Sequence, residues 1–268
     1  VVLSRGLGDV YKRQLILVLP HDQRFTHIGR NRLSKPVCLV TGVGPAKGTG
    51  GEIVKRFAEG GYQVAMLARN TENLKTLERN IENAVAFPCD VGDLELLVKT
   101  IEQIKETLGH PEVVIHNALR SVRGSILELD PDDLERNFRV NTTALLHLAR
   151  ETLPAMIDAG KGAILITGNT SATRGKTNWG FFASTKAAQR ILAESIAREF
   201  GPKGIHTAYF IIDASIDTPR TRPMLAPDKP DEFFAKPSAI AEEMYRVAHQ
   251  DKSAWSFTVE LRPFGEVW

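Results

Sequence analysis

The sequence predicts one doubly wound α/β domain, with a parallel sheet of seven strands and helices on both faces. The chain has 268 residues, 43% of them hydrophobic and 25% charged, which suits one large globular domain. From residue 35 onward, short apolar runs alternate with longer segments of helical spacing. Most of these runs are apolar at every position, as in strands buried on both faces, and the alternation requires crossover connections between parallel strands.

The predicted strands are bounded by glycine, proline and polar turn residues. The first, at residues 37–41, ends in a glycine cluster. The last, at residues 257–261, alternates apolar with polar side chains, which is typical of a strand at the edge of a sheet. The strands between them are expected at residues 64–67, 84–87, 113–115, 163–167 and 205–212.

The predicted helices occupy the intervals between the strands. Asp130 is a favourable N-cap and Pro131 suits a first turn, so one long helix is expected from there to Ala159. The stretch Thr218–Lys236 is expected to be irregular, and to be either a lid over a site or an exposed connection. The other helices are expected at residues 50–59, 71–83, 94–108 and 179–200.

Residues 1–34 do not fit this pattern, and we predict a non-native or flexible N-terminal extension before a domain of residues 35–268. The segment Asp9–Gln14 resembles the translated end of a sequencing adaptor. This resemblance predicts that residues 1–14 are an assembly scar and that residues 15–33 are translated upstream sequence. The alternative is a genuine flexible arm.

Composition argues against several classes of partner. The net charge is +2 and both signs are mixed along the chain, so we expect no nucleic acid partner. No apolar run approaches the roughly 18–20 residues that span a bilayer, so we expect no membrane partner. Cys38 and Cys89 lie inside apolar runs, which favours buried thiols in a reducing cytoplasm over a disulfide. We also expect no metal site.

A glycine-rich segment, Thr41–Gly50, joins the first strand to the first helix. At such a junction glycines let the backbone approach a pyrophosphate, and the N-terminus of the helix stabilises its charge, as in a Rossmann-like dinucleotide site. The alternative is a glycine turn without a ligand. The candidate phosphate-binding residues are Thr41, Gly42, Gly44, Lys47, Gly48 and Gly50.

The end of the second strand indicates which dinucleotide is bound. An acidic residue there would accept hydrogen bonds from the ribose of NAD, but the chain has Ala68 followed by Arg69. Arg69 can pair with a 2′-phosphate, and Lys47 adds a second positive charge. These residues favour NADP(H) over NAD(H), and the alternative is that both are solvated surface charges.

Together these motifs resemble the short-chain dehydrogenase/reductase family. The family has the pattern Thr-Gly, three residues, Gly, one residue, Gly. This chain matches it with Gly42, Gly48 and Gly50 if two extra residues are accepted. A match that starts at Gly44 has the correct spacing but lacks the threonine. The resemblance implies that Asp90 lies near the adenine and that Asn117 belongs to the cofactor site. Beside Asn117, His116 and Leu119 depart from the family pattern.

The resemblance also implies a catalytic group with one member replaced. Lys186 matches the lysine that holds the nicotinamide ribose, and Asn141 the asparagine that supports a water linked to that lysine. The tyrosine expected four residues before the lysine is Phe182, and the serine expected thirteen residues earlier is Asn169. Thr218 matches the threonine that contacts the nicotinamide carboxamide.

Two functions are compatible with this pattern. The first is an NADP(H)-dependent oxidoreductase for a small carbonyl or secondary alcohol, whose modified proton relay uses Thr170, Ser171, Asn169 or Lys186 through water. The second is a catalytically silent NADP(H)-binding protein, either a sensor or an oligomer partner. The long helices at residues 131–159 and 179–200 correspond to those with which the family forms dimers and tetramers, so a homo-oligomer is expected.

Overall fold

The computed structural model describes residues 35–225 and 227–266 and contains the expected parallel sheet. The expectation for residues 1–34 lies outside the described part. The seven strands run in the order β3-β2-β1-β4-β5-β6-β9, so the fold class and the edge position of the last strand are confirmed. They are β1 Val37–Thr41, β2 Gln63–Ala68, β3 Ala84–Pro88, β4 Pro111–His116, β5 Gly162–Gly168, β6 Ile205–Ile212 and β9 Thr258–Leu261.

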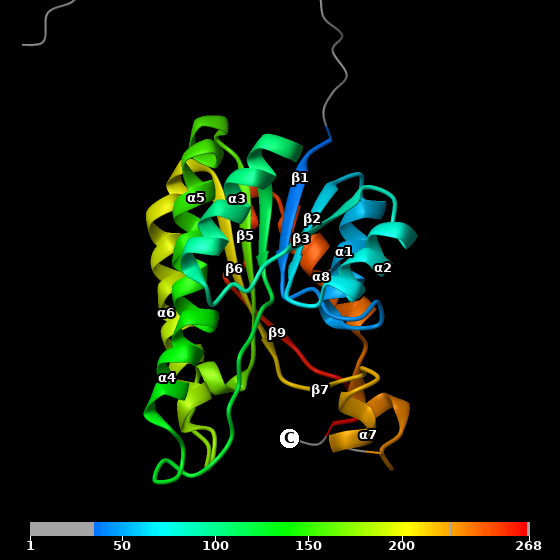
Figure 1. Cartoon of the computed structure of the whole chain (residues 1–268), viewed down its shortest axis with the longest axis vertical. Coiled ribbons are helices and arrows are strands. Elements are labelled where there is room, and N and C mark those ends of the chain that lie inside the picture. Colours follow the sequence, from blue (N-terminus) through cyan, green and yellow to red (C-terminus); the bar gives the residue numbers. More distant parts are fainter. Residues whose placement is uncertain (1–34, 226, 267–268) are drawn as a thin grey trace, which may run out of the picture. The chain divides into compact units, whose positions relative to one another are not determined.

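Helices cover both faces of the sheet (Figure 1). Helices α3 (Leu94–Leu108), α5 (Ala144–Ala159) and α6 (Gly180–Phe200) pack on one face. Helices α1 (Thr49–Glu59), α2 (Thr71–Asn80) and α8 (Pro237–Ala248) pack on the other. Successive strand residues alternate between two cores, with Leu39 in the first and Cys38 and Val40 in the second. Because both faces are covered, most residues of the inner strands are apolar.

Side-chain caps set the starts of several helices. Asp130 accepts a hydrogen bond from the backbone N–H of Asp132 at the start of α4 (Pro131–Phe138). Asp93 and Asn70 cap α3 and α2 in the same way. Helix α2 ends three residues before its expected end, because the chain then turns into β3 through Asn83, whose φ is +67°.

The long helix expected at residues 131–159 contains an irregular turn. A π-helical segment, Arg139–Thr143, separates α4 from α5. The carbonyls of Val140 and Asn141 accept hydrogen bonds from the His116 ring, and the Asn141 carbonyl also accepts one from the Gln189 amide. In a regular helix these carbonyls would accept hydrogen bonds from backbone N–H groups one turn later. Here they accept from side chains, which is a physical reason for the wider turn.

The segment expected to be irregular near residues 218–236 has short elements of its own. Strands β7 (Ser215–Ile216) and β8 (Phe234–Ala235) pair in parallel on either side of α7 (Thr221–Leu225). Arg222 binds Asp217 through two hydrogen bonds and contacts the carboxylate of Asp231 at 2.9 Å. This arginine therefore connects the two sides of the segment. Within the described residues, no helix combines the length and apolar character needed to cross a membrane.

Candidate active site

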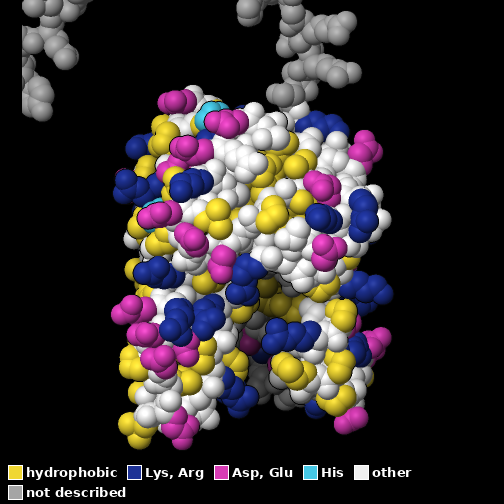
Figure 2. All heavy atoms as spheres, in the orientation of Figure 1, with side chains coloured by type: hydrophobic (Ala, Val, Ile, Leu, Met, Phe, Trp, Pro, Cys, Tyr) yellow, Lys and Arg dark blue, Asp and Glu magenta, His cyan; other side chains and the backbone are white. Residues whose placement is uncertain are grey.

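A cleft lies at the carboxyl ends of the parallel strands, around the adjacent strands β1 and β4, between which the strand order reverses. This point, at which the strand order reverses, is where doubly wound sheets bind ligands. The cleft has a volume of about 1740 Å³, larger than the roughly 300–1,000 Å³ typical of a small-molecule pocket. It therefore has room for a dinucleotide and a substrate together. Figure 2 shows a hollow in this face with Lys and Arg side chains on its rim.

The glycine turn after β1 forms one wall of the cleft. Gly42 has a φ of +70°, and a Cβ there would lie 2.5 Å from the backbone of Ala118, so only glycine lets the ends of β1 and β4 approach so closely. Gly50 packs in the same way against the Gly42 carbonyl. By contrast, Gly44 lines the cleft and has open space where its Cβ would be. Gly44 is thus the position at which a ligand could approach the backbone.

Helix α1 starts at this turn with its first N–H groups available. Gly48 is its N-cap and has no side chain to bond them, so they can receive an anion at the positive end of the helix dipole. The loop contains a tight turn, in which the Gly48 N–H donates to the Pro45 carbonyl at 2.8 Å. Lys47 is exposed on this turn and is not among the residues that line the cleft. The candidate glycines Gly42, Gly44, Gly48 and Gly50 line the cleft, whereas Lys47 does not.

Thr41 and His116 form a buried network behind the glycine turn. The His116 Nε2 faces the carbonyls of Val140 and Asn141 at 3.1 and 3.2 Å, so Nε2 carries the proton. Its Nδ1 therefore accepts from the Thr41 hydroxyl at 3.0 Å, and that hydroxyl accepts from the backbone N–H of Ala118. Burial first, and then the charge of Lys186, lower the pKa of His116 to about 4. Thr41 and His116 are thus supports for the site and lie outside its lining.

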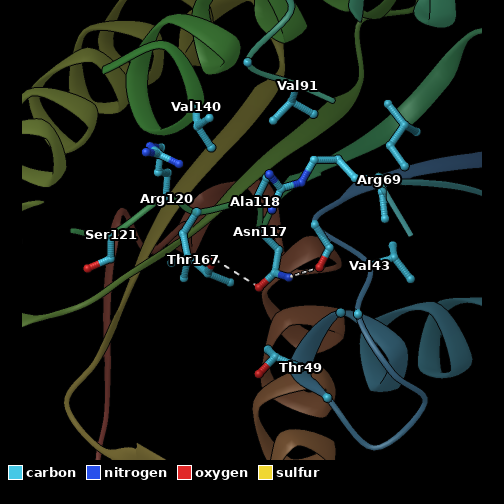
Figure 3. Close-up of a pocket in the computed structure, with 18 of the residues that line it drawn as sticks. Val43, Thr49, Arg69, Val91, Asn117, Ala118, Arg120, Ser121, Val140 and Thr167 are labelled. Carbon is cyan, nitrogen blue, oxygen red and sulfur yellow. Dashed lines mark hydrogen bonds between the residues drawn. The ribbon is translucent and has the colours of Figure 1, made fainter. Parts of the chain in front are cut away.

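Asn117 connects three strands at the floor of the cleft (Figure 3). Its amide nitrogen donates to the Gly42 carbonyl at 3.0 Å, and its amide oxygen accepts from the Thr167 hydroxyl at 3.2 Å. The side chain expected to touch a cofactor is thus used to hold the glycine turn and β5 in place. Its outer surface still lines the cleft.

Charged and amide side chains line the cleft at the ends of β2 and β3. The Arg69 side chain is 74% exposed, lies 3.9 Å from a carboxylate oxygen of Asp90, and is shown among the lining residues in Figure 3. The other carboxylate oxygen of Asp90 accepts from the Gly92 N–H at 2.9 Å. Asn70 and Asn73 complete this region. A guanidinium group and two amides are suitable donors for a phosphate.

Lys186 is a buried cation that lines the same cleft and is only 2% exposed. Its ammonium donates to the Thr167 carbonyl at 2.8 Å and to the Gln189 amide oxygen at 2.5 Å. Burial lowers the pKa of Lys186 to about 7. Both protonation states are therefore populated near neutral pH.

The positions around Lys186 that usually supply proton transfer are altered. Phe182 lines the cleft and packs against Trp179 with 5.8 Å between ring centroids. Asn169 lines the cleft too, and its amide oxygen accepts from the Ser171 N–H at 3.0 Å. Its amide NH₂ is therefore the group that can donate a hydrogen bond to a ligand. Thr170 and Ser171 are not among the lining residues, although the sequence marked them as candidates.

Asn141 has a structural task next to the cleft. Its side-chain amide bonds both the N–H and the carbonyl of Arg120, each at 2.9 Å, as a neighbouring strand would. The same amide donates to the Thr185 hydroxyl at 2.9 Å. Asn141 therefore fixes the segment after β4, including Arg120 and Ser121, which line the cleft (Figure 3).

Thr218 lies at the opposite side of the cleft, where the segment containing α7 begins. It lines the cleft, and its hydroxyl accepts from the Thr221 N–H at 3.0 Å and bonds the Thr221 hydroxyl at 2.8 Å. Arg220 lines the cleft beside it and is exposed. Both residues belong to the stretch that the sequence marked as a lid or a connection.

Two residues near Lys186 were missed by the sequence reasoning. Gln189 is completely buried, three residues after Lys186, and its spacing on the helix was the available signal. The second is Tyr209 on β6, whose hydroxyl lies 3.3 Å from the Gln189 amide oxygen and 3.4 Å from the Lys186 carbonyl. Its ring occupies the space that a side chain at Gly168 would need. No local pattern in β6 indicates this contact, because it joins residues distant in sequence.

Comparison with known proteins is consistent with this geometry. The family described as short chain dehydrogenase matches residues 36–227. Fatty acyl-CoA reductase from Acinetobacter baylyi is 30% identical over 215 residues, which cover 78% of this chain and 70% of that protein. A fatty acyl-CoA reductase from Mycobacterium tuberculosis is 28% identical over 233 residues, covering 84% of this chain and 74% of that protein.

Solved structures share the fold. A short-chain dehydrogenase from Rhodopseudomonas palustris superposes with a TM-score of 0.73 and 31% identity, covering 85% of this chain and 99% of its own. An alcohol dehydrogenase from the archaeon Thermococcus sibiricus, solved with 5-hydroxy-NADP, has a TM-score of 0.75 and 24% identity over 87% of this chain and 98% of its own. At that identity, the second likeness concerns the fold alone.

Proposed function

The chain belongs to the short-chain dehydrogenase family, and on that premise we propose that it is an NADP(H)-dependent oxidoreductase that interconverts a carbonyl and a secondary alcohol. The observation that carries the proposal is that Lys186 and the glycine turn line one continuous cleft. A dinucleotide whose diphosphate meets the N-terminus of α1 could extend toward Lys186 within that cleft. The relatives named fatty acyl-CoA reductase support an oxidoreductase function.

The residues around the turn fit such a cofactor. Gly44 leaves open space at the cleft surface, and α1 begins without a side-chain cap. Arg69 would hold the 2′-phosphate of NADP(H), with Asn70 and Asn73 as further donors. Asp90 would lie near the adenine and Thr218 near the nicotinamide carboxamide. The preference for NADP(H) rests on Arg69 and on Ala68 in the place of an acid, and not on Lys47.

The proposed chemistry divides between the cofactor and the protein. When bound, NADPH supplies a hydride to the carbonyl carbon. The chain must supply the proton for the oxygen, and it must do so without a phenol at position 182. Lys186 lines the cleft four residues after Phe182 and is the candidate source of this proton. The Asn169 amide is a candidate donor of a hydrogen bond to the developing oxyanion.

A turnover assay tests this function. NADPH absorbance is followed with ketones, aldehydes and quinones, and the names of the relatives justify adding long-chain aldehydes and fatty acyl-CoA thioesters. We expect turnover with at least one class, and loss of that turnover in Lys186→Ala. Binding of neither NADPH nor NADH, measured by calorimetry, would contradict the proposal.

A second function is supported by Phe182 and by the altered serine position. The chain could bind NADP(H) without turnover, as a sensor or an oligomer partner. Tight NADPH binding without oxidation of any compound in the panel, with activity appearing only in Phe182→Tyr, would favour this function over the first. Turnover by the unaltered chain would exclude it.

We also propose that the chain forms a homo-dimer or homo-tetramer through α5 and α6. Leu146 on α5 and Ile191 on α6 are exposed apolar side chains, 40% and 58% exposed. Light scattering of the full chain, with Leu146→Glu and Ile191→Glu as disrupting changes, tests the assembly. A monomeric mass at micromolar concentration would contradict it. The cytoplasmic location stays a prediction.

A further inference from the structure

The buried amide of Gln189 joins Lys186 to the π-helical turn without an intervening water. Its oxygen accepts from the Lys186 ammonium at 2.5 Å, and its nitrogen donates to the carbonyl of Asn141. Lys186, Gln189 and Asn141 are 2%, 0% and 0% exposed. The family resemblance leads one to expect a water at this point, and in this chain a side chain makes the connection.

The orientation of the Gln189 amide is determined by its neighbours. If the amide were flipped, its NH₂ would face the ammonium of Lys186 and its oxygen would face the Asn141 carbonyl, so both contacts would become repulsive. The Tyr209 hydroxyl can donate to the same amide oxygen at 3.3 Å. The oxygen of Gln189 is therefore a fixed acceptor for Lys186.

Two fixed acceptors leave one position of the Lys186 nitrogen unassigned. The Thr167 carbonyl and the Gln189 amide oxygen cannot release a proton to Lys186, so two N–H bonds stay directed at them in either charge state. The remaining position carries the third N–H in the ammonium and the lone pair in the neutral amine. Because Lys186 lines the cleft, this titrating position is the one available to a ligand there.

The charged and titratable groups around Lys186 are few. His116 on β4 interacts with it electrostatically and is held neutral by burial, and the Tyr209 ring on β6 lies 5.9 Å from the ammonium nitrogen. Among the described residues, no carboxylate forms an ion pair or hydrogen bond with Lys186. The neutral amide of Gln189 thus supports the ammonium without pairing it to a full negative charge.

We propose that Gln189 is a positioning residue that directs the exchangeable proton of Lys186 into the cleft, so that Lys186 takes the place of the missing tyrosine as proton donor and acceptor. This inference rests on the proposed oxidoreductase function. In the reducing direction, the carbonyl carbon gains a hydride from NADPH, and the oxygen gains a proton from the Lys186 ammonium, directly or through one water. The products are the alcohol, NADP⁺ and neutral Lys186, which regains its proton from solvent.

The first test measures the titration of Lys186 by NMR of the full chain labelled at the lysine side chains, with Lys186→Met identifying its signal. In Gln189→Glu, a carboxylate replaces the amide at nearly the same size, and the acid dissociation constant of Lys186 should fall about tenfold or more. In Gln189→Met, the acceptor is lost while the space stays filled, and the constant should rise. Gln250→Glu is the matched control, because Gln250 bonds Ser256 and not Lys186, and it should leave the acid dissociation constant of Lys186 unchanged.

Opposite shifts separate positioning from a structural role. If Gln189 only filled space, both substitutions would loosen the site, admit water and move the pKa of Lys186 upward together, and that result would overturn the inference. This readout needs neither cofactor nor turnover, so it is independent of whether the proposed function holds.

The second test uses the carbonyl reduction found in the substrate panel. In the unaltered chain, kcat/KM should fall about tenfold between pH 6 and pH 8, as the ammonium is lost, and only about twofold in Gln189→Glu. An unchanged pH profile would refute the role of Lys186 as proton donor while leaving the oxidoreductase function standing. Absence of turnover with the whole panel would instead refute the proposed function.

Discussion

Phe182 and His116 both depart from the residues that the family resemblance leads one to expect, but with different physical consequences. Phe182 removes an ionisable hydroxyl from the surface of the cleft and leaves an apolar ring against Trp179. His116 is buried behind the glycine turn and exchanges hydrogen bonds with Thr41 and with two carbonyls of the π-helical turn. The first change acts on chemistry, and the second acts on the stability of the site.

Restoring a hydroxyl at residue 182 should raise activity. In Phe182→Tyr, a phenol would enter the cleft on the same helix face as Lys186, one turn away. General acid catalysis typically contributes about 10²–10⁴ in rate, and because Asn169 still replaces the serine we expect a gain near 10² in kcat/KM. Steady-state kinetics measures the gain, and Phe181→Tyr on the same helix is the control. A lower rate in Phe182→Tyr would contradict this prediction, because it would show that the site does not use a hydroxyl at residue 182.

His116 should make the protein sensitive to mild acid. Its pKa is about 4 in the folded chain and 6.5 ordinarily, so between these values the unfolded chain binds more protons. The free energy of unfolding should therefore fall as the pH falls through this window, by about 3 kcal/mol in total. Urea unfolding at several pH values measures the slope. His116→Asn should be less stable at pH 7 but should lose this part of the slope, and an identical slope in both proteins would contradict the assignment.

At the scale of elements, the sequence predicted each strand of the main sheet and the order of strands and helices, because burial on both faces leaves a strong apolar pattern. It could not predict where a side chain of one element fills the space that a side chain of a distant element would need. Gly168 on β5 and Tyr209 on β6 are such a pair, since a Cβ at Gly168 would lie 2.1 Å from the Tyr209 ring. The π-helical turn was missed for the same reason, because its partners His116 and Gln189 come from other elements.

The Gly168–Tyr209 contact predicts strong coupling between the two strands. Gly168→Ala should destabilise the protein by about 1–3 kcal/mol or more through overpacking, and Tyr209→Ala by about 3–5 kcal/mol through the cavity it leaves. The double variant should cost clearly less than the sum, because the new methyl group enters the vacated space. Denaturant unfolding of the four proteins measures this. Tyr209→Phe keeps the ring and should give no rescue, and additive effects in the alanine cycle would contradict the contact.

At the scale of the whole molecule, the cleft draws its lining from both sides of the point at which the strand order reverses. The glycine turn, Arg69 and Asp90 come from one side, and Asn117 and Lys186 from the other. Regular alternation in the sequence was sufficient to predict that these residues meet, because the carboxyl ends of parallel strands share one edge. The hydrogen-bond partners of individual residues were not predictable. The Thr41 hydroxyl bonds His116, and the Asn117 amide bonds the Gly42 carbonyl.

A ligand that contacts both sides of the cleft should stabilise the whole domain, because it binds the folded chain and not the unfolded one. At a concentration about 100-fold above its dissociation constant, NADPH should add about 2.7 kcal/mol. For a domain of this size, that corresponds to a rise in Tm of roughly 5–10 °C. NADH at the same concentration should give a smaller rise, and Arg69→Gln should remove most of the difference, because Arg69 is the proposed partner of the 2′-phosphate. Arg79→Gln, on the exposed side of α2, is the control. Equal shifts with both dinucleotides in the unaltered chain would contradict the role given to Arg69 but not the binding itself.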